Sequence, residues 1–350
     1  MRIGTFAKEL VSTARQLATP GKGILAADES LTTLGNRFSK INLENTYENR
    51  EAYRSMLFTT PSLSNYISGA IQFDETLKNK TPEGELLQNI LKKSNIIPGI
   101  KVDKGLSLLS NDETLTTGLD GLEDRVKYYY SQGCRFAKWR GVIKISNKTP
   151  STLAIEENAN SLAKYAYICQ SNGLVPIVEP EVLAEGDHDI DTCAEVSTIV
   201  YSAVINALHK HSVLFEGILL KPNMIAPGIK SQKKASFQEI AQKTLETLNR
   251  TIPPAVPGIM FLSGGQSEED ASCNLNEINQ INKGKGPWVL SFSYGRALQA
   301  SSLKAWHGKN IKAGQEALLH RVKMNSLATL AKYQKENGNG ESLHVSNYSY

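Results

Sequence analysis

Eight short apolar runs recur along the chain and constrain its fold more than any other feature of the sequence. Each run is rich in Ile, Val, Leu, Phe or Ala, and most are bounded by Gly, Pro, Asp or Asn. Continuous apolar runs of this length are typical of parallel strands that are buried on both faces. The runs cover residues 23–28, 66–73, 97–103, 134–140, 174–181, 214–221, 258–263 and 288–294.

The spacing of the runs leaves room for one helix after each strand. Successive runs begin about 38 residues apart on average, which accommodates a strand, a helix and two loops. Segments 151–170, 191–209 and 237–248 carry apolar residues among polar ones, as amphipathic helices do. This alternation predicts an α/β fold with parallel strands, and closure into a (β/α)8 TIM barrel is the natural interpretation. A doubly wound open sheet stays as the alternative.

Both ends of the chain extend beyond this pattern. An amphipathic N-terminal helix is indicated by apolar residues at helical spacing, namely Ile3, Phe6, Leu10, Ala14 and Leu17. A mitochondrial transit helix is the alternative, and Glu9 counts against it. No long Pro/Gly/Ser linker separates the strand units, so we expect one barrel domain over residues 1–335. The Gly-rich stretch 336–341 opens a flexible C-terminal tail, residues 336–350, which ends in Tyr350.

Composition excludes several classes of protein. Hydrophobic residues are 40% and charged residues 21%, which is ordinary for a soluble enzyme. The net charge of +4 comes without a dominant basic block, so no nucleic-acid partner is expected. No apolar run approaches the roughly 18 residues of a transmembrane helix, so no membrane insertion is expected. The four cysteines are scattered and are expected to be reduced intracellular thiols.

Charged residues stand where most of the predicted strands end. Barrel enzymes place their chemistry at these carboxyl ends, and side chains two positions apart on a strand share a face. Lys and Glu are otherwise depleted in strands, so their gathering here favours an active site. A solvated polar rim is the alternative. The residues are Asp28, Lys101, Asp103, Lys138, Arg140, Glu179, Glu181, Lys221 and, after the last strand, Arg296.

Lys221 lies in an apolar stretch, Ile-Leu-Leu-Lys-Pro-Asn. Burial beside other cations favours a neutral amine, which Schiff-base chemistry requires. Glu179 or Glu181 would then transfer the protons needed to dehydrate the carbinolamine and cleave a bond. A salt-bridged structural lysine is the alternative interpretation.

Two neighbouring loops fit a phosphate group. Ser263-Gly264-Gly265 follows the seventh strand and Gly295-Arg296 follows the eighth, which is where barrels often bind phosphate. Glycine lets backbone N–H groups approach the anion, and arginine binds it through two N–H groups. None of the six histidines lies in a strand run and no G-x-G-x-x-G follows a strand, so neither a metal nor a dinucleotide cofactor is expected.

Seven sequence blocks, in order, resemble the class I fructose-bisphosphate aldolases over nearly the whole chain. They are GKGILAADES (21–30), PGIKVDKG (98–105), RFAKWR (135–140), VPIVEPE (175–181), LLKPNM (219–224), FLSGGQS (261–267) and SFSYGRALQ (291–299). The resemblance implies reversible cleavage of fructose 1,6-bisphosphate to dihydroxyacetone phosphate and glyceraldehyde 3-phosphate, in glycolysis and gluconeogenesis, with no cofactor.

The resemblance also implies roles for individual residues. Lys221 would form the Schiff base, with Glu179 as general acid and base and Glu181 in support. Asp28 would assist carbon–carbon cleavage, Lys138 would stabilise charge, and Tyr350 would exchange protons with the enamine. The implied ligands of substrate hydroxyls and phosphates are Ser30, Thr33, Arg37, Lys101, Arg140, Ser263, Gly264, Gly295 and Arg296.

The family implies a cytoplasmic homotetramer, and the basic mouth of the barrel would suit cytoskeletal or acidic-peptide partners. Two other functions stay open at this point, a transaldolase-like Schiff-base enzyme and a non-catalytic scaffold. One stretch departs from the family's pattern, since Asn36 stands before Arg37 where a lysine is common. We hypothesise that this lowers affinity for the 6-phosphate and weakens discrimination against fructose 1-phosphate.

Overall fold

Eight parallel strands pair in a closed ring, in the order β1-β10-β9-β8-β7-β6-β3-β2. The computed structural model describes residues 3–110, 112–336 and 340–345. Every predicted run overlaps one strand of the ring, so the predicted TIM barrel is confirmed and an open sheet is excluded. The strands are β1 (Gly23–Ala27), β2 (Ile67–Gln72), β3 (Ile97–Lys101), β6 (Phe136–Ile143), β7 (Val175–Val182), β8 (Leu219–Leu220), β9 (Gly258–Phe261) and β10 (Val289–Tyr294).

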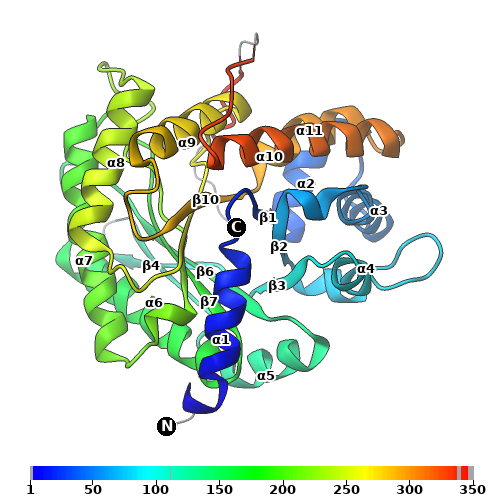
Figure 1. Cartoon of the computed structure of the whole chain (residues 1–350), viewed down its shortest axis with the longest axis horizontal. Helices are drawn as coiled ribbons and strands as arrows, with labels where there is room; N and C mark the ends of the chain where they lie inside the picture. The colour runs from blue at the N-terminus through cyan, green and yellow to red at the C-terminus, as the bar shows by residue number, and fades with distance from the viewer. Residues whose placement is uncertain (1–2, 111, 337–339, 346–350) are drawn as a thin grey trace.

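Helices surround the strands (Figure 1). Several begin at a side chain that accepts a hydrogen bond from the first turn, as Ser151, Asp189 and Ser236 do. The helices are α1 (Ile3–Leu17), α2 (Leu31–Ser39), α3 (Tyr47–Phe58), α4 (Leu87–Lys93), α5 (Leu122–Gln132), α6 (Thr152–Ser171), α7 (Ile190–Lys210), α8 (Phe237–Thr251), α9 (Glu268–Asn282), α10 (Arg296–Trp306) and α11 (Ile311–Thr329). The segments predicted as helices correspond to α6, α7 and α8.

Two apolar layers hold the barrel together. The larger fills the space between strands and outer helices. The smaller lies inside the barrel, where Phe136, Ile177 and Leu219 meet Leu10 and other buried residues of α1. The predicted N-terminal helix is therefore confirmed, and it covers the end of the barrel at which the strands begin. Burying one such side chain fully stabilises the fold by about 1.5–3 kcal/mol.

Two local features differ from the predicted pattern. The sixth strand is much shorter than its apolar run, because a 3-10 turn at Phe215–Gly217 occupies the middle of that run and Pro222, which has no N–H, follows Lys221. After β3 the chain adds an antiparallel hairpin of β4 (Leu106–Ser110) and β5 (Glu113–Thr116), which lies outside the barrel sheet.

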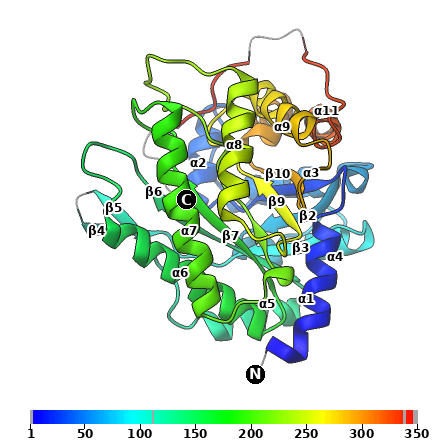
Figure 2. The ribbon, with the colours of Figure 1, turned by 60° about the vertical axis from the view of Figure 1, so that its left-hand side comes forward.

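The C-terminal segment lies at the end of the molecule opposite α1 (Figure 2). After α11, the Glu336 carboxylate accepts hydrogen bonds from Arg321 and Tyr333, and Leu343 donates its backbone N–H to the Gly265 carbonyl at 3.0 Å. Tyr350 lies outside the described residues. In the described parts of the chain, no helix is long and apolar enough to cross a membrane.

Candidate active site

Four charged residues stand one layer above the apolar interior of the barrel. Lys138, Glu179 and Lys221 each follow an interior residue by two positions, since Phe136, Ile177 and Leu219 belong to the buried layer. Asp28 follows Ala26 in the same way. Because side chains alternate along a strand, all four point into the barrel at its carboxyl end. The predicted convergence of these side chains is therefore observed.

Lys138 is the centre of the cluster and is completely buried. Its Nζ lies 2.7 Å from Asp28 Oδ2, 3.7 Å from Glu179 Oε2 and 4.0 Å from Asp103 Oδ2. Burial alone would lower the pKa of Lys138, but the three carboxylates outweigh burial and raise the pKa. Burial would raise the pKa of Asp28, and the ammonium groups of Lys138 and Lys221 lower it. Asp28 and Lys138 thus form an ion pair inside the barrel.

Lys221 directly follows β8 and contacts the Glu179 carboxylate at the oxygen that does not face Lys138. Its Nζ lies 3.1 Å from Glu179 Oε1, and both side chains are only 2% exposed. The backbone N–H of Lys221 donates to the Val178 carbonyl at 2.8 Å, which continues the β7–β8 ladder past the strand. Glu179 therefore lies between two ammonium groups, one at each carboxylate oxygen.

Arg140 and Glu181 form a second buried pair above the first. Arg140 Nε donates to Glu181 Oε2 at 2.5 Å, and the two strands that carry them, β6 and β7, are paired along their length. Burial would raise the pKa of Glu181, but Arg140, followed by Arg296 and Lys221, lowers it. Glu181 is therefore ionised at neutral pH and holds the Arg140 guanidinium in place.

A polar pocket opens beside these residues at the carboxyl ends of the strands. It brings together residues predicted for catalysis and residues predicted for phosphate binding, and two that were not predicted, Leu262 and Ser293. The lining residues are Arg37, Arg140, Glu179, Glu181, Lys221, Leu262, Ser263, Gly264, Ser293, Gly295 and Arg296.

The sequence and its fold were compared with known proteins. Residues 9–350 match the family described as fructose-bisphosphate aldolase class-I. Cytosolic fructose-bisphosphate aldolase 4 of Arabidopsis thaliana is 57% identical over 98% of this chain and 89% of the relative. The spinach cytoplasmic isozyme is 56% identical over 99% of both chains. A solved Plasmodium falciparum fructose-bisphosphate aldolase, in complex with TRAP and a small-molecule inhibitor, superposes with TM-score 0.93 and 53% identity over 95% of this chain and 97% of that one.

The chain belongs to the class I fructose-bisphosphate aldolases. Its activity is the reversible cleavage of fructose 1,6-bisphosphate to dihydroxyacetone phosphate and glyceraldehyde 3-phosphate, a carbon–carbon lyase reaction. Neither a transaldolase-like enzyme nor a non-catalytic scaffold is favoured by these relatives.

Some residues implied by the aldolase resemblance do not line the pocket. Ser30 Oγ accepts the Thr33 N–H at 3.3 Å as the N-cap of α2, and Thr33 is buried. Lys101 Nζ lies 2.5 Å from Asp103 Oδ1 and also donates to the Asp103 carbonyl. These three remain predictions as substrate ligands.

The interior of the aldolase barrel holds polar groups that sequence reasoning missed. The Ser293 hydroxyl is buried, lines the pocket and has no hydrogen-bond partner among the described residues. The sequence does predict the position of this hydroxyl. Ser291 and Ser293 alternate with Phe292 and Tyr294 on β10, so both serines face the interior of the barrel. Glu29 was also missed. Its carboxylate accepts a hydrogen bond from the Arg37 guanidinium, which lines the pocket.

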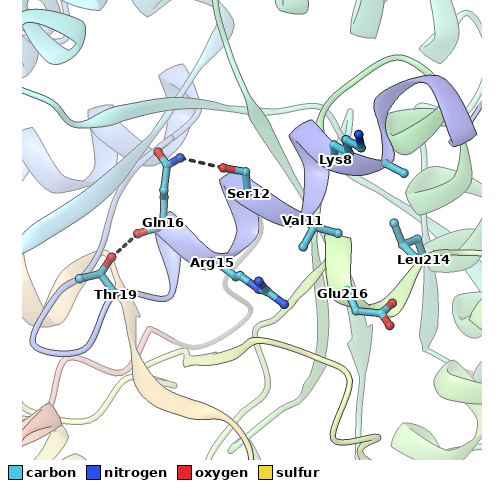
Figure 3. Close-up of a pocket in the computed structure, with 9 residues that line it drawn as sticks. Lys8, Val11, Ser12, Arg15, Gln16, Thr19, Leu214 and Glu216 are labelled. Carbon is cyan, nitrogen blue, oxygen red and sulfur yellow. Dashed lines mark hydrogen bonds between the residues drawn. The ribbon is translucent and has the colours of Figure 1, made fainter.

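The surface is also hollowed at the other end of the barrel, beside α1 (Figure 3). Lys8, Arg15 and Glu216 line this shallow groove together with short polar and apolar side chains. It does not include the strand-end residues of the aldolase site. Among residues 3–110, 112–336 and 340–345, no group of three His, Cys, Asp or Glu side chains is placed to hold a metal ion.

Proposed function

We propose that the chain cleaves fructose 1,6-bisphosphate through a Schiff base on Lys221. The observation that carries this proposal is the 3.1 Å contact between the buried side chains of Lys221 and Glu179, from Nζ to Oε1. A lysine nucleophile needs an adjacent group that accepts its proton, and Glu179 is within hydrogen-bond reach.

The Lys221 amine attacks the C2 carbonyl of the sugar to form a carbinolamine. Glu179 returns a proton to the C2 hydroxyl, which leaves as water and gives the protonated Schiff base. Asp28 then accepts the proton of the C4 hydroxyl while the C3–C4 bond breaks. The electron pair of that bond moves into the iminium, which yields the enamine and glyceraldehyde 3-phosphate. Protonation at C3, which we assign to Tyr350, and hydrolysis release dihydroxyacetone phosphate and regenerate Lys221.

The neighbouring charges support this sequence of steps. The Lys138 ammonium, which stays protonated beside Asp28, stabilises negative charge that develops near C2 and on the C4 oxygen. Glu181 orients Arg140 through the 2.5 Å contact, and we assign Arg140 and Lys101 to the hydroxyl groups and the 6-phosphate. Ser30 and Thr33 at the start of α2, with Arg37, supplement that phosphate site.

We assign the 1-phosphate to Ser263, Gly264, Gly295 and Arg296, which line one side of the pocket. The helix α10 begins at Arg296, so the N–H groups of its first turn and the positive end of its dipole favour an anion at this position. The Ser293 hydroxyl, which lines the same pocket, supplies a further donor.

Borohydride trapping tests the covalent step. The protein is incubated with dihydroxyacetone phosphate and borohydride, and the adduct is mapped by peptide mass spectrometry. We expect a stable adduct on Lys221, its absence in Lys221→Gln, and its retention in Lys210→Gln, which alters an exposed lysine of α7. Activity that EDTA abolishes, or an adduct confined to other lysines, would contradict the Schiff-base mechanism.

We further propose that the enzyme acts in glycolysis and gluconeogenesis in the cytoplasm. The Arabidopsis and spinach relatives are named cytosolic and cytoplasmic isozymes, whereas a pea relative of 55% identity is named chloroplastic. Fractionation of cells that express the tagged chain distinguishes the two compartments, since a chloroplast form would copurify with plastids.

A homotetramer is the proposed assembly. Apolar side chains on α6 and α7 support it, because Leu153 and Ile199 are each 51% exposed and Tyr167 is 41% exposed. Sedimentation equilibrium should give the mass of four chains, and the double variant Leu153→Asp/Ile199→Asp should sediment as smaller species. The cations at the barrel mouth further support binding of acidic peptides, including cytoskeletal ones, which competition by substrate would reveal.

A further inference from the structure

Asn223, two residues beyond Lys221, links the chain segment that follows β8 to the end of β7. We propose that Asn223 is a positioning residue, whose side-chain amide holds Lys221 at hydrogen-bond distance from Glu179. The inference rests on the proposed Schiff base on Lys221, because Asn223 does not line the pocket and would act only through its neighbours.

Pro180 interrupts the hydrogen-bond ladder between β7 and β8. The Lys221 N–H donates to the Val178 carbonyl at 2.8 Å, and in a parallel ladder the Lys221 carbonyl would next accept from the residue two positions after Val178. That residue is Pro180, which has no N–H. The strand β7 nevertheless continues to Val182, whereas β8 ends at Leu220. Another bond is therefore needed to join the two segments beyond this point.

The Asn223 side chain supplies that bond. Its Oδ1 accepts the backbone N–H of Val182 at 2.9 Å and the hydroxyl of Tyr201, on α7, at 2.8 Å. Its Nδ2 donates to the Met224 carbonyl at 3.2 Å, so both ends of the amide are bonded. Two donors meet at one oxygen, and turning the amide over would leave the buried Val182 N–H without an acceptor.

The two bonds between these segments lie on either side of the catalytic pair. Glu179 follows Val178 and precedes Val182 on β7, and Lys221 precedes Asn223. The amine and its proton acceptor, which are 3.1 Å apart, are therefore carried by segments that are joined both before and after them. Proton transfer requires a separation of about 2.6–3.2 Å, so loss of the second bond should move the amine out of reach.

Tyr201 holds the same amide from the helix layer. Its side chain is buried, and its hydroxyl also reaches the Asn223 carbonyl at 3.3 Å. Burial raises the pKa of the Tyr201 hydroxyl well above its usual 10, so the hydroxyl keeps its proton and remains a donor at neutral pH. Tyr201→Phe should therefore loosen the amide without removing its bond to Val182.

Asn223→Ala removes the amide, and Gln170→Ala is the matched control. Gln170 is also a buried amide, and it bonds Leu214 and Gly217 ahead of β8, at the opposite end of the barrel. We expect Asn223→Ala to lower kcat for fructose 1,6-bisphosphate about 10–100-fold and to slow borohydride trapping of dihydroxyacetone phosphate on Lys221 by a similar factor. Its affinity for inorganic phosphate, measured by calorimetry, should stay within about twofold of the unaltered chain, because the amide does not contact the assigned phosphate ligands.

Two measurements separate positioning from stability. Gln170→Ala should lower the urea midpoint as Asn223→Ala does, since each leaves buried backbone groups unbonded, and should keep kcat within about twofold. Asn223→Asp keeps the acceptor for Val182 and Tyr201, so its kcat should be about five- to tenfold above that of Asn223→Ala. If Asn223→Ala does not fold, Tyr201→Phe provides the test, with kcat about two- to fivefold lower and KM unchanged.

Equal losses of kcat in Asn223→Ala and Gln170→Ala would overturn the positioning role, because stability alone would then account for both. Equal kcat in Asn223→Ala and Asn223→Asp, or an unchanged kcat in Tyr201→Phe, would overturn it as well. Failure of the unaltered chain to form an adduct on Lys221 is a different result. It would refute the proposed Schiff base itself.

Discussion

The ammonium of Lys138 lies 2.7 Å from the carboxylate of Asp28, and neither side chain is more than 1% exposed. A buried ion pair is worth little net stability in most proteins, but removing one partner leaves an uncompensated charge. Here Lys138 also faces Glu179 and Asp103, which Lys221 and Lys101 contact as well. Removing Lys138 would therefore leave two lysines beside three carboxylates.

Lys138→Met should lower the free energy of unfolding at pH 7 by about 3–5 kcal/mol, since it leaves the carboxylates without that cation. Urea denaturation followed by circular dichroism measures the change. The double variant Asp28→Asn/Lys138→Met should recover part of the loss, because one fewer negative charge is then buried. Equal stability of the single variant and the unaltered chain would contradict the ion-pair account.

Glu179→Gln should lower kcat by about 10²–10⁴-fold, because the amide cannot exchange protons with the Schiff-base intermediates. The overall fold should be retained, since the side chain keeps its shape. Glu181→Gln is the comparison. Because Glu181 contacts Arg140, its loss should raise KM for fructose 1,6-bisphosphate by a larger factor than it lowers kcat. Steady-state kinetics gives kcat and KM for both variants. If the two substitutions changed kcat and KM by the same factors, the proposed difference between the roles of Glu179 and Glu181 would be contradicted.

The ion-paired carboxylate of Glu75, which lies outside the active site, should make the stability of the fold depend on pH. It lies between two arginines of α3, with Arg50 Nη2 at 2.7 Å and Arg54 Nη1 at 2.5 Å. Burial raises the pKa of Glu75, but hydrogen bonds from the two arginines outweigh burial and hold the pKa below its usual 4.5. A carboxyl group with a lowered pKa stabilises the fold fully above its unfolded pKa, and this contribution is lost as the pH falls through the folded value.

Glu75→Gln should therefore cost about 2 kcal/mol at pH 7, and the difference from the unaltered chain should shrink steadily below about pH 4.5. Urea denaturation at a series of pH values measures it. Glu316→Gln, which changes an exposed carboxylate of α11, is the control and should have little effect at any pH. A difference that persists unchanged to pH 3 would contradict the prediction.

Asn36 lies on the exposed side of α2, and its neighbour Arg37 lines the pocket. An exposed lysine in its place adds a screened charge, so Asn36→Lys should raise the ratio of kcat/KM for fructose 1,6-bisphosphate to that for fructose 1-phosphate about two- to threefold. The increase should disappear at high salt. An unchanged ratio at low salt would refute the hypothesis that Asn36 weakens discrimination.

The apolar runs, together with the two-residue alternation of side chains along a strand, were enough to predict much of this site from the sequence. The rule that side chains two apart share a face placed Lys138 with Arg140 and Glu179 with Glu181 correctly, because it depends only on backbone geometry. The same rule applied to Ser291 and Ser293 would have found the missed hydroxyl.

The alternation rule could not predict which charged side chains contact one another. Lys138 contacts Asp28, which directly follows β1, because its long side chain reaches across the interior. The strands β1 and β6 are not neighbours in the ring. Likewise, the glycine-rich stretch after residue 335 predicts a flexible tail, but the contact of Leu343 with Arg296 depends on backbone groups that carry no signal in the sequence.

The closed floor of the barrel has a consequence for the kinetics of isotope exchange. Beneath Lys138 the interior is filled by Phe136, Ile177, Leu219 and the helix α1, so hydrocarbon separates the buried carboxylates from water on that side. Substrate entry and the exchange of the Lys138 and Lys221 Nζ protons with solvent deuterium then both depend on the mouth at the opposite end of the barrel. A variant that narrows the mouth of the barrel is therefore expected to slow both together.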